Sequence, residues 1–176
     1  LDQVWVIEEE VNSLHKKIDK TCFQILACQS PVASDLRFIL AIIKINVDLE
    51  RMGDLVCNNS YAINDYLSVP PSIMVQRIKE MATTVTHMIR ECFDAFMDKD
   101  IDKARKVLDT DKVVDEFRDQ MRGELREVLR QGGQEVETCM ALLSVVRNLE
   151  RLADRSTNIA EEIIFYLTGD DIRHEP

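Results

Sequence analysis

The sequence has few of the residues that interrupt regular structure, with only 5 glycines and 4 prolines among 176 residues. A β-sandwich or β-barrel needs many more turn residues than that. The longest apolar run, residues 38–43, is far shorter than the roughly 20 residues of a membrane-spanning helix. The composition therefore favours an all-α fold without membrane insertion.

Positive charge and paired cysteines are also scarce. Lys and Arg number 22 against 32 Asp and Glu, which gives a net charge of −10. A nucleic acid would be repelled at long range by such a surface. The 5 cysteines lie far apart without a CxxC pair, which argues against a disulfide framework or a zinc ribbon. We expect a protein of a reducing compartment that does not bind nucleic acid.

Apolar residues recur at steps of three and four along the chain, which predicts long amphipathic helices. Before the second helix, Ser30 can cap free amides and Pro31 suits the first helical position. The predicted helices run to about residue 29, then over 31–66, 72–98, 101–130 and 134–167. The buried stripe expected for the second helix is Ile45, Leu49, Met52, Val56 and Ile63.

Two stretches of the chain repeat at a constant offset. Residues 49–54 (LERMGD) match residues 149–154 (LERLAD) at a shift of 100 positions. The helices that precede them match at a shift of 103, which aligns Glu8 with Asp111 and Asn12 with Asp115. The chain therefore contains a duplicated helical unit.

The repeat divides the chain into a first unit at residues 1–69, a second unit at 70–169 and a polar tail at 170–176. The second unit has three predicted helices, whereas the first has two. Symmetry therefore predicts a further helix before residue 1, which would cover Ile7, Leu14 and the stripe of the second helix. Without it, we expect an exposed apolar surface.

Each repeat carries an acidic pair, Glu50 with Asp54 and Glu150 with Asp154. Residues four apart lie one turn apart on the same face of a helix. If helix 101–130 packs antiparallel beside helix 134–167, four carboxylates converge, and such an oxygen-rich set suits hard or borderline metal ions. The predicted ligands of this second patch are Asp111, Asp115, Glu150 and Asp154.

The matching patch of the first repeat is Glu8, Glu50 and Asp54, and it is weakened by Asn12. A solvated acidic face balanced by Lys or Arg is the alternative interpretation, with Arg51 and Arg151 as candidates for ion pairs of little energetic weight. The duplication favours the metal interpretation.

Several motifs together resemble the PhoU family. They are residues 31–37 (PVASDLR), 48–54 (DLERMGD), 149–154 (LERLAD) and 158–161 (NIAE). The resemblance implies tandem duplicated three-helix bundles, six helices in all, with the first helix absent from this chain. It also implies paired E(D)xxxD motifs that bind multinuclear iron or zinc clusters. By position, these motifs fall on Glu8, Glu50, Asp54, Asp111, Asp115, Glu150 and Asp154.

The resemblance implies a cytoplasmic, non-enzymatic negative regulator of phosphate uptake and phosphate-starvation signalling. Such a protein couples the ATPase of a phosphate ABC transporter to a sensor histidine kinase, and we expect a homodimer. Three alternatives remain open: an accessory or fused domain of a sodium- or proton-coupled phosphate carrier, a metal enzyme, and a helical scaffold without metal. The enzyme is disfavoured because no Gly-rich phosphate loop or nucleophile motif occurs.

Overall fold

The computed structural model describes residues 2–66, 72–130 and 136–172, and every regular element within these ranges is an α-helix. The all-α prediction is thereby confirmed. None of the described helices is both long and apolar enough to cross a membrane. The helices are α1 (Asp2–Gln29), α2 (Ala33–Tyr66), α3 (Ser72–Asp98), α4 (Ile101–Arg130) and α5 (Val136–Thr168).

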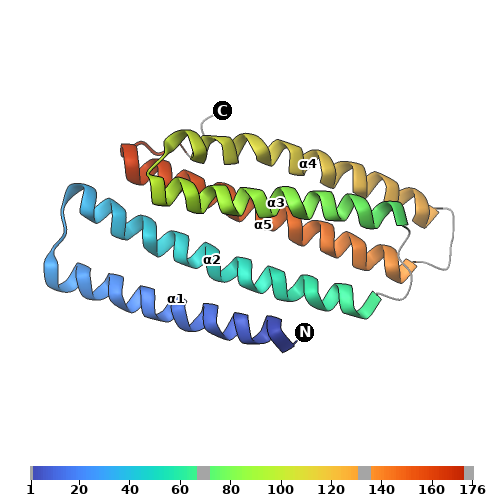
Figure 1. Ribbon diagram of the computed structural model, residues 1–176, viewed down its shortest axis with the longest axis horizontal. Helices are drawn as coiled ribbons and strands as arrows, with labels where there is room; N and C mark the ends of the chain where they lie inside the picture. The colour runs from blue at the N-terminus through green and yellow to red at the C-terminus, as the bar shows by residue number, and fades with distance from the viewer. Residues whose placement is uncertain (1, 67–71, 131–135, 173–176) are drawn as a thin grey trace.

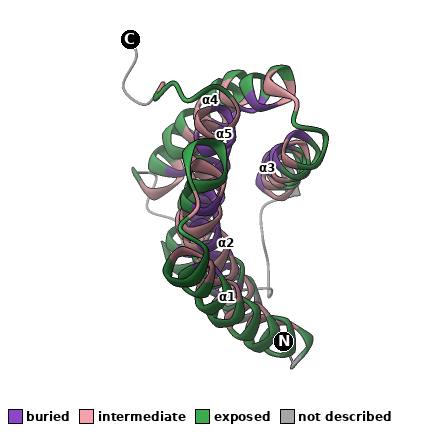
Figure 2. Ribbon diagram, turned by 90° about the vertical axis from the view of Figure 1, so that its left-hand side faces the viewer, coloured by how far each residue is buried: buried purple, intermediate pink, exposed green. Residues whose placement is uncertain are grey.

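Four of the helices follow one another in a single curved layer, in the order α4, α5, α2, α1, and α3 lies to one side of it (Figures 1 and 2). Helix α3 packs on α4 and α5, whereas α1 packs on α2 alone among the described helices. The second repeat is therefore a complete three-helix bundle, and the first repeat is a helix pair.

The two repeats meet where α2 packs against α5. Three polar pairs cross this seam. As the residue number in α2 increases from pair to pair, the residue number of its partner in α5 decreases, so the two helices are antiparallel. The pairs are Lys44 with Glu162 (2.8 Å), Asp48 with Arg155 (3.1 Å) and Asn59 with Asn148 (3.0 Å). Because Asn59, Asn148, Asp48 and Glu162 are all buried, these contacts fix the register of the seam.

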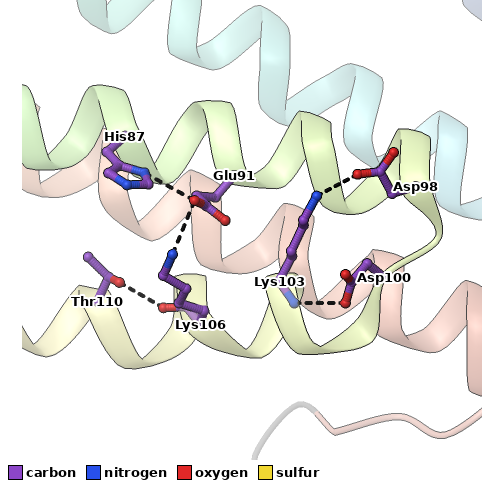
Figure 3. Close-up of polar contacts among 7 residues, drawn as sticks. All are labelled: His87, Glu91, Asp98, Asp100, Lys103, Lys106 and Thr110. Atoms are coloured by element: carbon purple, nitrogen blue, oxygen red, sulfur yellow. Dashed lines mark hydrogen bonds and ion pairs between the residues drawn. The ribbon is translucent and has the colours of Figure 1, made fainter.

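The turn between α3 and α4 is short and capped. Lys99 adopts a positive φ of 54°, and the Asp100 carboxylate accepts hydrogen bonds from the backbone amides of Asp102 (2.9 Å) and Lys103 (3.1 Å). Further along the hairpin, Lys106 of α4 forms a salt bridge of 3.2 Å with Glu91 of α3 (Figure 3). These contacts hold α3 against α4.

The predicted helix boundaries agree with the structure to within two residues, where both are described. Helix α2 begins at Ala33 and not at Pro31, because the backbone at Ser30 and Ala33 has positive φ values of 46° and 50°. The predicted start of the last helix at residue 134, the predicted boundary between the repeats at residues 69–70 and the end of the tail at 173–176 lie outside the described residues.

Two members of the predicted buried stripe are not buried. Val56 and Ile63 are each 47% exposed, whereas their counterparts in the second repeat, Ser156 and Ile163, are fully buried. The difference arises because α3 packs against α5, while no described helix takes the equivalent place against α2. Ile45 and Met52 are buried as predicted.

The apolar surface expected on the first repeat is present. Ile7 is 58% and Leu14 is 55% exposed on α1. We call the surface formed by Ile7, Leu14, Val56 and Ile63 the uncovered face. The further helix that symmetry places over it stays a prediction.

Candidate metal centre

The acidic residues of the second repeat lie where α4 packs antiparallel to α5. Asp111 and Asp115 stand one turn apart on α4, and Glu150 and Asp154 stand one turn apart on α5. Asp111 interacts electrostatically with each of the other three, and Asp154 interacts with Glu150 and Asp115. We call these four carboxylates the second-half cluster, and their role as ligands of one metal ion stays a prediction.

Two members of the second-half cluster have pKa values above the usual range for aspartate. Burial, together with the charges of Asp115, Asp154 and Glu150, raises the pKa of Asp111 to about 6. Burial and the charges of Glu150 and Asp115 also raise the pKa of Asp154, against smaller opposing effects of Arg155 and Arg118. Burial is the larger cause for both groups, and the neighbouring carboxylates add to it.

A single arginine lies inside the second-half cluster. Arg118 Nη1 donates to Asp115 Oδ1 at 2.5 Å and to Glu150 Oε1 at 2.9 Å, so the guanidinium joins α4 to α5. Its Nε donates to Asp119 Oδ1 at 3.0 Å. The side chain of Arg118 is mostly buried, which strengthens these charge-assisted hydrogen bonds.

The chemistry of the second-half cluster fits a hard or borderline cation. Its four side chains offer only carboxylate oxygens, the ligand type that such ions prefer. Across the described ranges, however, no three carboxylate, imidazole or thiol groups are arranged as a ready-made metal site. Metal binding would therefore require the carboxylates and Arg118 to rearrange.

The corresponding residues of the first repeat are less acidic. Asn12 donates from Nδ2 to Glu8 Oε1 at 3.3 Å. Burial, together with the charges of Glu8 and Asp54, raises the pKa of the Cys57 thiol. Glu50 lies one turn before Asp54 on α2 and is half-buried. We call Glu8, Asn12, Glu50 and Asp54 the first-half patch.

The arginines of the repeated motif play no part in either group. Arg51 and Arg151 are exposed, and neither forms a salt bridge with another described residue. The interpretation of LERxxD as an ion-pairing device through these arginines is therefore not supported. The balancing cation in the second repeat is Arg118.

The sequence analysis did not single out Arg118, although its spacing contains the signal. It lies seven residues after Asp111 and three after Asp115, so all three side chains lie on the same face of α4. Cys57 was also not singled out. It lies three residues after Asp54, a spacing that places both side chains on the same face of α2.

The chain is similar to known proteins over almost its whole length. A family model described as the PhoU domain matches residues 1–63 and 78–163. The phosphate-specific transport system accessory protein PhoU homolog of Pseudomonas aeruginosa is 34% identical over 176 residues, covering 98% of this chain and 72% of the relative. The corresponding PhoU protein of Escherichia coli is 29% identical over 167 residues, covering 95% and 69%.

Solved structures agree with this result. The crystal structure of PhoU from Pseudomonas aeruginosa matches with a TM-score of 0.87 at 32% identity, covering 96% of this chain and 81% of that chain. The phosphate transport system regulatory protein PhoU from Streptococcus pneumoniae has the same fold, with a TM-score of 0.87 at 24% identity. On the match of both repeats to the family model, the chain belongs to the PhoU family.

Proposed function

We propose that this chain is a regulatory accessory protein of a phosphate-specific transport system, and that it acts by binding other proteins and not by catalysis. The observation that carries the proposal is the family match across both repeats, together with relatives named as accessory proteins of such systems. In this role it would lower phosphate uptake and phosphate-starvation signalling when phosphate is plentiful.

The proposed partners are the ATPase of a phosphate ABC transporter and a sensor histidine kinase, both reached from the cytoplasm. The net charge of −10 favours a basic partner surface, or a contact in which a cation bridges two acidic surfaces. The uncovered face adds apolar area that is suited to burial against a further helix or a second copy of the chain.

We further propose that the second-half cluster binds a divalent or trivalent metal ion. Asp111 and Asp115 from α4 and Glu150 and Asp154 from α5 would hold it, and the bound ion would neutralise their mutual repulsion. Binding would tie α4 to α5. The first-half patch is the weaker candidate, because Asn12 supplies an amide where the second repeat has the carboxylate of Asp115.

A regulatory test uses the organism from which the chain comes. Deleting its gene is expected to switch on a phosphate-starvation reporter in phosphate-rich medium, and the unaltered gene is expected to restore repression. A reporter that stays silent after deletion would contradict the regulatory role. Supplying Asp111→Asn with Asp154→Asn in place of the unaltered gene then asks whether repression requires the second-half cluster.

A helical scaffold without metal is the second candidate, and one observation favours it. Arg118 already supplies a positive charge to Asp115 and Glu150, so part of the cluster is balanced from within the chain. Under this alternative, repression would survive the double substitution of Asp111 and Asp154. An accessory domain of an ion-coupled phosphate carrier would instead show association with that carrier and not with an ABC transporter ATPase.

A further inference from the structure

The end of the α1–α2 hairpin carries exposed apolar side chains. Figure 1 shows this end projecting beyond the neighbouring ends of α3, α4 and α5. Phe23 on α1 and Val32 in the turn are 58% and 72% exposed, and Leu36 and Leu40 on α2 are 37% and 39% exposed. At about 1.5 Å per helical residue, the three helical members lie within roughly 11 Å of the end of their helix. We call these four residues the apolar tip.

The apolar residues of the two helices lie on one side of the hairpin. Near its other end, the rings of Trp5 and Tyr61 are in contact, with centroids 5.3 Å apart, so these two side chains define one side of the helix pair. Phe23 follows Trp5 by about five complete turns, and Leu36 precedes Tyr61 by about seven. Phe23 and Leu36 therefore point to the same side as the aromatic pair, and Leu40 lies one turn after Leu36.

A group of exposed lysines precedes the apolar tip on α1. Its members, here called the lysine group, are Lys16, Lys17 and Lys20. None of them forms a salt bridge with another described residue. Asp19, which lies among them, is half-buried and accepts a hydrogen bond of 2.8 Å from Asn46. Residues 16–40 hold four basic and two acidic residues in a chain of net charge −10, so this end is locally positive.

The charge of α1 changes sign along the helix. Glu8, Glu9 and Glu10 lie in its first half, whereas the lysine group lies in its second half. The helix dipole does not account for the lysines, because its effect fades within the last turn and Lys20 stands more than two turns before Gln29. Salt bridges among the described residues do not account for them either. The pattern fits an outside partner that is negatively charged.

A projecting end that combines apolar and basic side chains is suited to a flat bilayer. Apolar side chains enter the region between headgroups and acyl chains, and lysines attract anionic headgroups. A protein partner would need a concave surface to match a projecting hairpin, whereas a bilayer needs none. We propose that the end of the α1–α2 hairpin docks on an anionic membrane surface through the apolar tip and the lysine group. Neither the metal binding nor the regulatory role proposed above is required for this contact.

The first-half patch does not prevent this contact. Glu50 stands ten residues after Leu40 on α2, or about 15 Å further from the hairpin end. This exceeds the roughly 8–10 Å over which exposed charges act at moderate salt concentrations. The chain would therefore touch the bilayer with the hairpin end, and the acidic groups would stay away from the lipid.

The test is co-sedimentation of the chain with lipid vesicles at low salt. Vesicles of equal parts phosphatidylglycerol and phosphatidylcholine should bind the unaltered chain, phosphatidylcholine alone should not, and added salt should release the chain. Leu36→Ser with Leu40→Ser removes apolar area and should lower the partition coefficient by about tenfold or more. Lys17→Glu with Lys20→Glu should lower it by a similar factor.

The second repeat supplies matched controls. At the shift of 100, Val136 and Met140 take the places of the two leucines of the apolar tip, and they are 51% and 56% exposed. No lysine occupies the positions that match the lysine group. Val136→Ser with Met140→Ser should leave vesicle binding unchanged. Arg105→Glu with Lys112→Glu, at exposed positions on α4, alters the net charge as much as the lysine reversal does and should also leave binding unchanged.

Circular dichroism checks that every variant is folded, and the lysine reversal, which changes exposed positions only, decides if the serine variant unfolds. Binding to anionic vesicles that the hairpin variants weaken and the controls preserve supports the proposal. Absence of binding to either kind of vesicle, equal binding to both kinds, or an equal loss in hairpin and control variants would overturn it. In the first of these cases, the hairpin end would be a surface for a protein partner.

Discussion

The two repeats share their backbone plan but differ in what completes them. In the second repeat, α3 packs on α4 and α5, and four carboxylates with one arginine lie on those two helices. In the first repeat, the corresponding apolar side is the uncovered face, and Asn12 replaces the fourth carboxylate. Duplication has therefore preserved the helices, while the two acidic groups have acquired different charge.

The difference teaches that a repeated motif does not guarantee a repeated site. LERxxD occurs in both halves, yet only the second half brings an aspartate and an arginine from the preceding helix to meet it. The residues outside the motif decide how the charge of the motif is balanced.

The largest expected contrast concerns the core. Met121 of α4 is fully buried beneath α3, whereas its counterpart Ile18 of α1 is half-buried. We expect Met121→Ala to lower the free energy of unfolding by about 2–5 kcal/mol, and Ile18→Ala to lower it by clearly less, because less apolar contact is lost. Urea denaturation of both variants measures this contrast. Equal losses would show that the first repeat is as well packed as the second.

The attachment of α1 depends on a polar contact that the second repeat lacks. The side-chain amide of Asn46 donates to the backbone carbonyl of His15 at 3.0 Å and to Asp19 at 2.8 Å, and the matching position 146 is a buried valine. Asn46→Val should cost about 1–3 kcal/mol, because it removes a buried donor from two partly buried acceptors. Hydrogen exchange should show the faster opening in α1.

The exposed residue Asn58 on the same helix supplies a control for that experiment. Asn58→Val should leave exchange in α1 unchanged. If Asn46→Val also leaves it unchanged, the polar contact does not hold α1 in place.

A smaller effect should appear in the pH dependence of stability of the metal-stripped chain. The pKa of Asp111 is about 6 in the folded chain against 3.8 for an unperturbed aspartate. The folded state therefore binds the extra proton over this interval, and the contribution of Asp111 to stability is lost as pH rises from about 4 to 6. Asp111→Asn cannot ionise and should be more stable than the unaltered chain above pH 6, by roughly 1 kcal/mol.

Below about pH 4 the advantage of Asp111→Asn should vanish, because the unaltered residue is then protonated in both states. Thermal unfolding of both proteins between pH 4 and 8 provides the measurement. Asp109→Asn, at an exposed position of the same helix, serves as the control. A stability difference that does not change with pH would contradict the repulsion inferred among the four carboxylates.

The smallest effect is expected from a substitution that makes the first LERxxD motif more like the second. Gly53 corresponds to the buried Ala153, and a methyl group added there would lie at an ordinary contact distance of 3.5 Å from Val11 Cγ1. Gly53→Ala should raise the free energy of unfolding by roughly 0.5–1 kcal/mol, because alanine favours the helix over glycine. Chemical denaturation would show the gain, and a loss would mean that α1 and α2 approach too closely to accept the methyl group.

Much of the fold could be predicted from the sequence because long helices leave a clear period in apolar residues. The helix ranges followed from that period, whereas the shared role of Asp111, Asp115, Glu150 and Asp154 as metal ligands stays a prediction. The exposure of Val56 and Ile63 could not be predicted in this way, because periodicity identifies an apolar face without showing whether another helix covers it.

The balance of charge within the second-half cluster was the other feature that spacing alone did not reveal. Arginine side chains are long and reach partners on either helix, so the choice of Arg118 over Arg151 depends on the packing of α4 against α5. The start of α2 at Ala33 was likewise set by local backbone conformation and not by the capping pattern at Ser30 and Pro31.

The most direct test of the account is elemental analysis of the chain purified without a metal-affinity tag, beside the variant Asp111→Asn with Asp154→Asn. Circular dichroism would confirm that both proteins are equally helical. The account predicts stoichiometric metal in the unaltered chain and its loss from the second-half cluster in the variant. An unaltered chain that carries no metal and takes up none from iron or zinc solutions, or a variant that retains all of it, would contradict the central claim.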